Sequence, residues 1–271
     1  MIHELELAAM LAGEEIVRVK QRVGTTATTK ADGSPVSAAD EAAEVLILER
    51  LERLFPDIPI VAEERVAAGR IPSLDDLAEG RFFLVDPLDG TREFVAGRTE
   101  YTVNIALIER GTPVAGVVVV PEEWQLFSAV SDHSEVASFT AGAAVDERQR
   151  LRVRVAGPSP LALVSRSHLT PETNTWLARR RITQTTDAGS SLKFCRIAAG
   201  QADVYPRLGP TSQWDTAAGD AVLRGAGGKT TTLDGAPLAY VPRDGSAKAR
   251  FLNPNFVASG LWDDPTAAMQ G

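Results

Sequence analysis

The sequence predicts an α/β protein whose first half is of the α+β kind and whose second half alternates strand and helix. Apolar residues recur at helical spacing over residues 4–22, and short buried runs such as 81–87 end at turn residues. Of the 271 residues, 44% are hydrophobic and 24% are charged, which is typical of an ordinary globular chain with a sizeable core.

Two helices followed by a series of strands are expected in the first half. The second helix, within residues 35–55, should be capped by Ser37, with Asp40 and Glu41 in its first turn. Residues 132–150 show no clear period and should form hairpins and loop. Strands are predicted over residues 58–64, 81–87, 101–109, 112–121, 124–130 and 151–155.

The pattern changes after the segment "AGPSP", residues 156–160. From there, strand-like and helix-like segments alternate as in an α/β protein. A boundary near residue 157 would divide the chain into residues 1–157 and residues 158–271, although the two halves could also share one continuous core.

The net charge and the short apolar runs limit which nucleic acids, small molecules or membranes this protein could bind. The formal net charge of -8 argues against a general affinity for DNA or RNA, because such binding depends on Lys and Arg that neutralise phosphates. An anionic small substrate would need local cations. The longest apolar run, residues 117–120, is far below the roughly 20 residues of a membrane-spanning helix, so we expect no membrane span.

We expect the protein to be cytoplasmic. Its single cysteine, Cys195, cannot form an internal disulfide and is expected to pack in the core, which fits a reducing compartment. The start "MIHELELAAMLAGEE" lacks the basic residues and cleavage site of a secretory signal, so we read it as mature protein. Both a monomer and a homodimer remain open.

The predicted strand at 81–87 runs directly into an acidic turn. Pro87 cannot donate to a sheet ladder and disfavours helix at Asp86, so the strand should stop there and the chain should turn through Gly90. The pattern Asp-Pro-x-Asp-Gly is also good turn chemistry by itself, and other acids must converge before a metal site is favoured.

This turn nevertheless brings together the oxygen ligands that Mg²⁺ prefers. Asp86 and Asp89 can face one volume, and the carbonyl of Leu88 can join them as a third oxygen. Gly90 and Thr91 could add backbone N–H donors to an anion if a helix starts here.

Acids follow two other element boundaries. Glu63 and Glu64 end the predicted strand at 58–64, and Asp215 stands at a helix start. Each alone is more often a helix cap or a solvent-facing group. Three acidic clusters favour one shared site, because open α/β sheets gather ligands at the carboxyl ends of their strands.

Several other chemistries are excluded by spacing. Phosphatases that form an aspartyl-phosphate carry Asp-x-Asp-Gly-Thr, whereas the sequence here is Asp-Pro-Leu-Asp-Gly-Thr, which leaves a metal-ligand arrangement with water as the nucleophile. The sequence contains no Walker-type Gly-x-x-x-x-Gly-Lys, no His-Glu-x-x-His and no Cys-x-x-Cys, so zinc is not expected.

Ordered motifs resemble those of a known family. The segments "VDPLDGTREF" and "WDTAAGD", with the earlier "EE", resemble the inositol monophosphatase superfamily over most of the chain. A narrower resemblance, to its CysQ-type 3′(2′),5′-bisphosphate nucleotidases, is carried by "DGSPVSAAD", "SRSH", "GSSLKF", "YPRLGPTSQWDTAAG" and "FLNPNF".

The resemblance implies a layered αβαβα sandwich and a Mg²⁺-dependent phosphatase. Its expected reaction removes the 3′-phosphate of 3′-phosphoadenosine 5′-phosphate to give AMP and phosphate, with the 5′-phosphosulfate as a further candidate substrate that would give adenosine 5′-phosphosulfate. The alternatives are a broader inositol monophosphatase or fructose-1,6-bisphosphatase with the same metals, and a non-catalytic phospholigand-binding protein that kept the fold.

The resemblance also implies the metal ligands. Glu63, Asp86 and the carbonyl of Leu88 would hold one Mg²⁺, and Asp86, Asp89 and Asp215 would hold a second. A third, weaker Mg²⁺ near Glu63 is allowed by the same likeness. The first half, residues 1–157, would thus supply most of the metal site.

The catalytic pair implied by the resemblance is Asp40 and Thr91, which would orient and deprotonate the attacking water. Judged by local sequence alone, Thr91 is a turn residue and Asp40 is a first-turn helix acid. The resemblance favours the catalytic interpretation.

Substrate recognition is expected mainly in the second half, residues 158–271. Lys193 would neutralise the 5′-phosphate, and Arg166 and Arg207 are further phosphate candidates. By base rates, His168 is more often a loop residue and Lys193 a solvated helix lysine. The expected substrate contacts are Gly90, Thr91, Ser165, His168, Ser190, Lys193 and Asp215.

Overall fold

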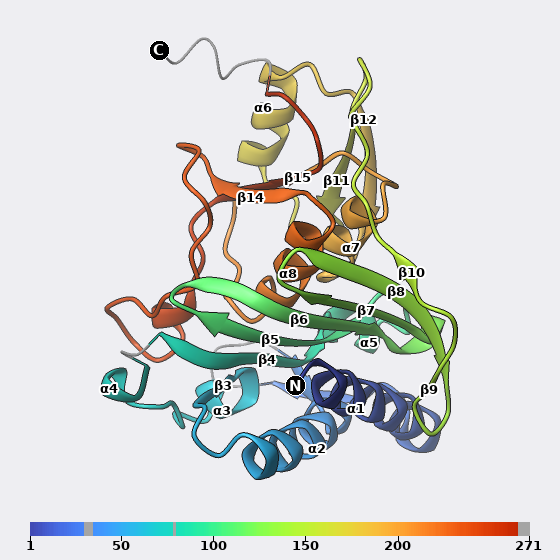
Figure 1. Ribbon diagram of the computed structural model, residues 1–271, viewed down its shortest axis with the longest axis vertical. Coiled ribbons are helices and arrows are strands. Elements are labelled where there is room, and N and C mark those ends of the chain that lie inside the picture. The colour runs from blue at the N-terminus through green and yellow to red at the C-terminus, as the bar shows by residue number, and fades with distance from the viewer. Residues whose placement is uncertain (30–34, 78–79, 265–271) are drawn as a thin grey trace.

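The computed structural model describes residues 1–29, 35–77 and 80–264. Helices and sheets alternate in stacked layers, with the N-terminal helices at one end of the molecule and α6 near the other (Figure 1). This is the αβαβα sandwich expected above. Within the described ranges, no helix is both long enough and apolar enough to span a bilayer.

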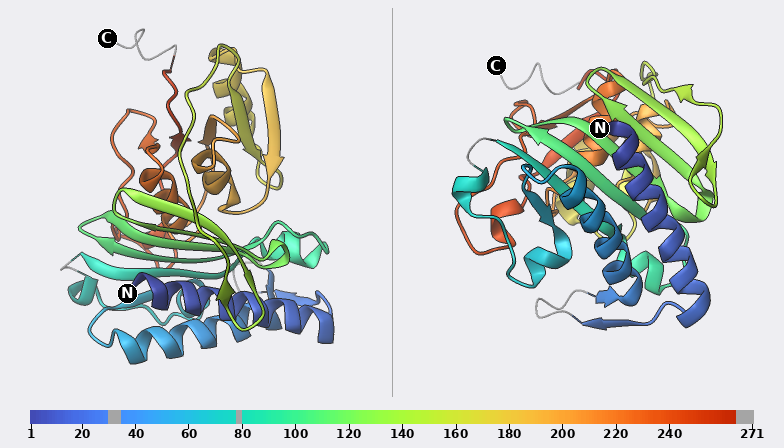
Figure 2. Two further views of the ribbon diagram at one scale, coloured as in Figure 1. Left: turned by 45° about the vertical axis from the view of Figure 1, so that its right-hand side comes forward. Right: turned by 60° about the horizontal axis from the view of Figure 1, so that its bottom comes forward.

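The first layer consists of α1 (Ile2–Val23) and α2 (Ala38–Leu54), which lie side by side against one face of a sheet (Figure 2). Ser37 caps α2 as predicted: its hydroxyl accepts from the N–H of Ala39 at 3.2 Å, and Asp40 accepts from the N–H of Ser37 at 2.8 Å. This reciprocal capping box fixes the start of α2 and with it the position of Asp40.

The large sheet has eight strands in the order β10-β8-β7-β6-β5-β4-β3, with β9 paired to β8. All of its pairs are antiparallel except β3 with β4, so these two strands end at the same edge. The strands are β3 (Ile60–Ala62), β4 (Arg81–Asp89), β5 (Thr102–Glu109), β6 (Thr112–Val120), β7 (Gln125–Val130), β8 (His133–Thr140), β9 (Ala144–Val145) and β10 (Gln149–Arg150). A separate small sheet pairs β1 (Ala27–Thr29) with β2 (Pro35–Ser37).

Strand β4 does not stop at Asp86, as the proline suggested, but continues to Asp89. Asp86 pairs with Asn104 and Asp89 pairs with Thr102, so three steps on β4 oppose two on β5. This irregularity accommodates Pro87, which has no N–H to give to the ladder.

The strand predicted at 151–155 is wrong. This segment is an extended connection whose N–H groups bond to different neighbours: Leu151 donates to Ser134 at 2.8 Å and Val153 donates to Ala226 at 3.0 Å. A single bridge joins Val155 to Leu261. Leu151 and Val153 of this connector pack against the core, whereas Val155 is 74% exposed.

The second half forms a five-stranded sheet in the order β12-β11-β13-β15-β14. β11 is parallel to β12 and β13, whereas β15 is antiparallel to both of its neighbours. Its strands are β11 (Leu161–Ser165), β12 (Gln184–Ala188), β13 (Val204–Arg207), β14 (Lys229–Thr232) and β15 (Phe256–Ser259), and its helices are α6 (Pro171–Arg179), α7 (Leu192–Ala198) and α8 (Ala217–Gly225).

Helices α7 and α8 lie between the two sheets (Figure 1), and one buried cluster joins the halves. It contains Phe82 and Val118 from the large sheet together with Trp214 and Ala218 from the second half. Short helices α3 (Glu63–Ala67) and α5 (Thr91–Val95) follow β3 and β4, and α4 (Leu74–Leu77) lies between α3 and β4. The 3₁₀ turns η1 (Pro121–Glu123) and η2 (Ala249–Phe251) complete the fold.

Candidate active site

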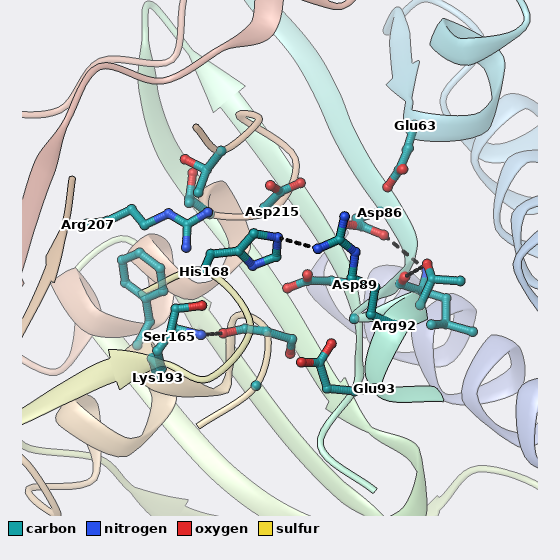
Figure 3. A pocket seen from close by; sticks show the side chains of 18 of the residues that line it. Glu63, Asp86, Asp89, Arg92, Glu93, Ser165, His168, Lys193, Arg207 and Asp215 are labelled. Carbon is teal, nitrogen blue, oxygen red and sulfur yellow. Dashed lines mark hydrogen bonds between the residues drawn. The ribbon is translucent and has the colours of Figure 1, made fainter. Parts of the chain in front are cut away.

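A cavity of about 270 Å³ opens where the ends of β3 and β4 face elements of the second half (Figure 3). It collects residues that are far apart in the sequence. The predicted residues that line it are Glu63, Asp86, Leu88, Asp89, Gly90, Thr91, Ser165, His168, Ser190, Lys193 and Asp215. Asp40, the remaining predicted residue, lies behind Thr91.

Three acids converge at one side of this cavity. Glu63, Asp86 and Asp215 each offer a carboxylate oxygen, and these oxygens all lie within 4.8 Å of one another. Burial raises the pKa of Asp86 well above its ordinary value, and the nearby Glu63 raises it further; burial also raises that of Asp215. Such a group of mutually repelling oxygens fits a hard divalent cation.

The sequence folds locally to support this cluster. Parallel pairing of β3 with β4 brings Glu63 and Asp86 to one edge, and the N–H of Leu88 donates to Asp86 at 3.1 Å. Gly90 has a φ of +98°, and a Cβ there would lie 3.3 Å from the Cβ of Tyr101. Helix α5 then begins at Thr91. A helix start at this turn was the condition under which Gly90 and Thr91 could offer backbone N–H donors to an anion.

Asp89 lines the same cavity, but among the described residues it is not part of the group of close carboxylates that Glu63, Asp86 and Asp215 form. Its carboxylate accepts the N–H of Ser191 at 2.7 Å and faces the amide of Asn104 at 3.4 Å. Burial raises the pKa of Asp89 to about 6, and the positive charge of Lys193 offsets part of this effect.

Asp40 and Thr91 form a hydrogen-bonded pair that reaches from α2 to the cavity. The Thr91 hydroxyl lies 3.1 Å from one carboxylate oxygen of Asp40 and 3.3 Å from the carbonyl of Leu88. The other oxygen of Asp40 accepts from the N–H and the hydroxyl of Ser37 at 2.8 Å and 2.6 Å. Asp40 is only 1% exposed, so these hydrogen bonds hold its carboxylate in one position.

Basic groups occupy the opposite side. Lys193 is buried, and its ammonium donates to the carbonyls of Ser190 at 2.6 Å and Ala188 at 3.2 Å. Burial lowers the pKa of Lys193 to about 8, while Asp89 acts in the opposite direction. This lysine is therefore not the solvated side chain that base rates favoured.

His168 and Arg207 extend the basic side. Burial, followed by the charge of Arg207, lowers the pKa of His168, and Arg92 Nη1 lies 3.4 Å from His168 Nε2. Arg207 is buried, lines the cavity, and has a guanidinium Nε with no hydrogen-bond partner among the described residues. An unpaired buried donor of this kind fits an anionic ligand.

Arg166, the other arginine proposed for phosphate, does not lie in the cavity. It forms ion pairs with Glu100 and Asp187, which explains why it turns away from the site. Conversely, sequence reasoning missed Glu93, which lines the cavity. Its signal was its place two residues after Thr91, but an acid in the first turn of a helix is common for other reasons.

The chain is similar to known proteins over nearly its whole length. A model of the inositol monophosphatase family matches residues 2–262. The protein named 3′(2′),5′-bisphosphate nucleotidase CysQ from Escherichia coli strain K12 is 42% identical over 262 residues, covering 96% of this chain and 99% of its own length. Its counterpart from Salmonella typhimurium is 43% identical over 257 residues, covering 94% of this chain and 98% of its own length.

Solved structures show the same likeness. The crystal structure of CysQ from Bacteroides thetaiotaomicron superposes with a TM-score of 0.80 at 33% identity and covers 97% of both chains. The inositol monophosphatase from Anabaena gives a TM-score of 0.71 at 25% identity, covering 99% of this chain and 95% of its own.

Proposed function

This chain belongs to the inositol monophosphatase family, and we propose that it is a Mg²⁺-dependent 3′(2′),5′-bisphosphate nucleotidase. The reaction is hydrolysis of the 3′-phosphate of 3′-phosphoadenosine 5′-phosphate to AMP and phosphate. One observation carries this proposal: a cavity with converging Glu63, Asp86 and Asp215 on one side and buried Lys193 and Arg207 on the other. Such a cavity suits a substrate with two phosphates.

The residues suited to hold metal are the converging acids. We assign Glu63, Asp86 and the Leu88 carbonyl to one Mg²⁺ and Asp86, Asp89 and Asp215 to a second. When bound, Mg²⁺ supplies positive charge that neutralises the phosphate and makes water a better nucleophile at neutral pH. A third ion near Glu63 stays a prediction.

Asp40 and Thr91 are assigned to the attacking water. The Thr91 hydroxyl accepts a hydrogen bond from the water and passes its own proton to the Asp40 carboxylate, to which it already points at 3.1 Å. The water gives a proton to the Thr91 oxygen as its own oxygen bonds to phosphorus, so Asp40 ends the step protonated. The bond from phosphorus to the 3′-oxygen breaks, and that oxygen takes a proton from solvent to become the 3′-hydroxyl of AMP. Ser37 holds Asp40 in place throughout, which limits reorganisation.

Lys193 and Arg207 are assigned to the second phosphate, with Ser165, His168 and Ser190 completing the substrate side. A group bearing two negative charges is better held by buried, fixed cations than by exposed ones. The alternative function is a broader sugar or inositol phosphatase with the same metals, for which these cations would add little.

The deciding experiment compares turnover of 3′-phosphoadenosine 5′-phosphate, inositol 1-phosphate and fructose 1,6-bisphosphate with Mg²⁺, with EDTA as the metal-free control. We expect the nucleotide to have the highest kcat/KM and EDTA to abolish activity. Preference for either of the other substrates would overturn the assignment.

A matched variant, Lys193→Met, removes the buried charge but keeps much of the volume. We expect it to lower kcat/KM for the nucleotide strongly and that for inositol 1-phosphate little. Equal losses on both substrates would favour the broader phosphatase, because Lys193 would then not bind the second phosphate, which only the nucleotide carries.

A further inference from the structure

Glu93 is a carboxylate in the cavity that neither the metal cluster nor the water-activating pair uses. Its side chain lies in α5 and is 6% exposed, and Figure 3 shows the carboxylate turned toward the side of the cavity that Ser165 and Lys193 occupy. One oxygen, Oε1, accepts a hydrogen bond from the hydroxyl of Ser167. Among the described residues, nothing donates to its other oxygen, Oε2.

A carboxylate at this place is unexpected in a site for an anionic substrate. It repels phosphate, and a buried charge is costly unless it is hydrogen-bonded. The titratable groups near it include His168, Lys193 and Asp89, and the charge of Glu93 raises the pKa of each. None of them donates a hydrogen bond to Oε2, so a neutral O–H donor from the substrate is the partner that fits.

The location of Glu93 says which hydroxyl this is. Its charge acts both on Asp89, which is assigned to Mg²⁺ at the scissile phosphate, and on Lys193, which is assigned to the 5′-phosphate. Glu93 therefore lies near both phosphate positions, where the ribose that joins them would lie. In a nucleoside 3′,5′-bisphosphate the nearest neutral donor to that phosphate is the vicinal 2′-hydroxyl; in the 2′-phosphate isomer it is the 3′-hydroxyl. An acidic side chain that accepts a ribose hydroxyl is a general device of nucleotide sites.

We infer that Glu93 accepts a hydrogen bond from the sugar hydroxyl vicinal to the scissile phosphate and thereby selects ribose over deoxyribose. Ser167 fixes the first carboxylate oxygen and leaves the second to the substrate. The inference rests on the proposed nucleotidase function and adds to it a determinant of sugar specificity.

The test measures kcat/KM for 3′-phosphoadenosine 5′-phosphate and for its 2′-deoxy analogue with the wild type and with Glu93→Ala. A hydrogen bond to a charged group predicts that the wild type prefers the ribonucleotide about 10- to 100-fold. The alanine variant should bring this ratio close to one, mainly by losing activity on the ribonucleotide. Glu93→Gln, which keeps the shape and an acceptor oxygen but not the charge, should give an intermediate ratio.

The control variant is Ser167→Ala, which removes the donor to Oε1 but leaves the carboxylate. If Glu93 only holds the loop that carries Ser167 and His168, then Ser167→Ala and Glu93→Ala will lower activity on both nucleotides by the same factor, and the inference fails. Retention of the ribose preference in Ser167→Ala, together with its loss in Glu93→Ala, supports the inference. Melting temperatures of all variants check that each is folded.

Two outcomes separate this inference from the proposed function. A wild type that hydrolyses the ribonucleotide and the deoxy analogue equally well remains a nucleotidase but overturns the role of Glu93. A wild type that hydrolyses neither nucleotide, yet is active on inositol 1-phosphate, overturns the proposed function and the inference that rests on it.

Discussion

Replacing Asp89 by asparagine should stabilise the metal-free protein at neutral pH while it abolishes activity with Mg²⁺. Burial raises the pKa of Asp89 to about 6 from an ordinary 3.8. That difference corresponds to roughly 3 kcal/mol by which the folded state opposes ionisation of this group. Asparagine is nearly isosteric and keeps an oxygen for the N–H of Ser191, which donates to Asp89 at 2.7 Å.

The sign of the pH dependence follows from the direction of this pKa shift. Because the folded state holds the proton of Asp89 more tightly than the unfolded state does, metal-free stability is highest below about pH 4 and falls as the pH rises to about 6. The charge of Asp89 also raises the pKa of Asp86 and Asp215, so its removal relieves both. Loss of the attraction between Asp89 and Lys193 opposes these gains.

The net gain is therefore expected to be about 1 to 3 kcal/mol above pH 7, or a rise in Tm of about 3 to 8 °C. Thermal unfolding in EDTA between pH 4 and pH 8 measures it, and the gain should vanish near pH 4. Addition of Mg²⁺ should raise the Tm of the wild type and have little effect on the variant, because the variant lacks the carboxylate that we assign to the second Mg²⁺.

Asp76→Asn is the matched control. Asp76 is exposed, and hydrogen bonds from the hydroxyl and N–H of Ser73 lower its pKa. Neutralising it should bring no gain at any pH. A metal-free Asp89→Asn protein that is no more stable than the wild type at pH 8, or a gain of equal size at pH 4, would refute the reasoning.

Three further predictions concern the chemistry and the packing. Thr91→Val and Asp40→Asn should each lower kcat by about 10²- to 10⁴-fold with little change in KM, and steady-state kinetics that show a change only in KM would contradict their role. Gly116→Val should destabilise the protein by about 1 to 3 kcal/mol or more in urea unfolding, because a Cβ there would lie 2.6 Å from the carbonyl oxygen of Ala218. Gly157→Ala, whose Cβ meets nothing within 4 Å, should leave the unfolding midpoint unchanged.

Local sequence was sufficient to predict side chains whose positions are set by the end of a strand or the start of a helix. Glu63 and Asp86 could be predicted as neighbours because β3 and β4 are parallel and end at one edge. The capping box of Ser37 and Asp40 could also be predicted, because both partners lie within one helical turn. The contact between Asp40 and Thr91, 51 positions apart, was available only through the family resemblance.

Sequence reasoning failed where the structure depends on partners distant in the chain. Strands β14 and β15 were not predicted, because "KTTT" and "FVAS" are short and their pairing with each other closes the sheet of the second half. The exposed appearance of Lys193 in the sequence was misleading for a similar reason: its burial comes from surrounding elements, including Tyr205, whose ring centroid lies 5.1 Å from its ammonium.

The convergence of Glu63, Asp86 and Asp215 depends on how closely the two halves pack. Asp215 comes two residues before α8, and the position of α8 is set by its contact with the large sheet, where Gly116 leaves room for the backbone of Ala218. Any side chain at position 116 would push α8 and Asp215 away from Glu63 and Asp86, although it touches none of the three acids. Since carboxylate oxygens must meet within a few ångströms to share a cation, a packing change in the core should weaken metal binding before it unfolds the protein. The close approach of sheet and helix is therefore as much a condition of the proposed metal site as the acids themselves.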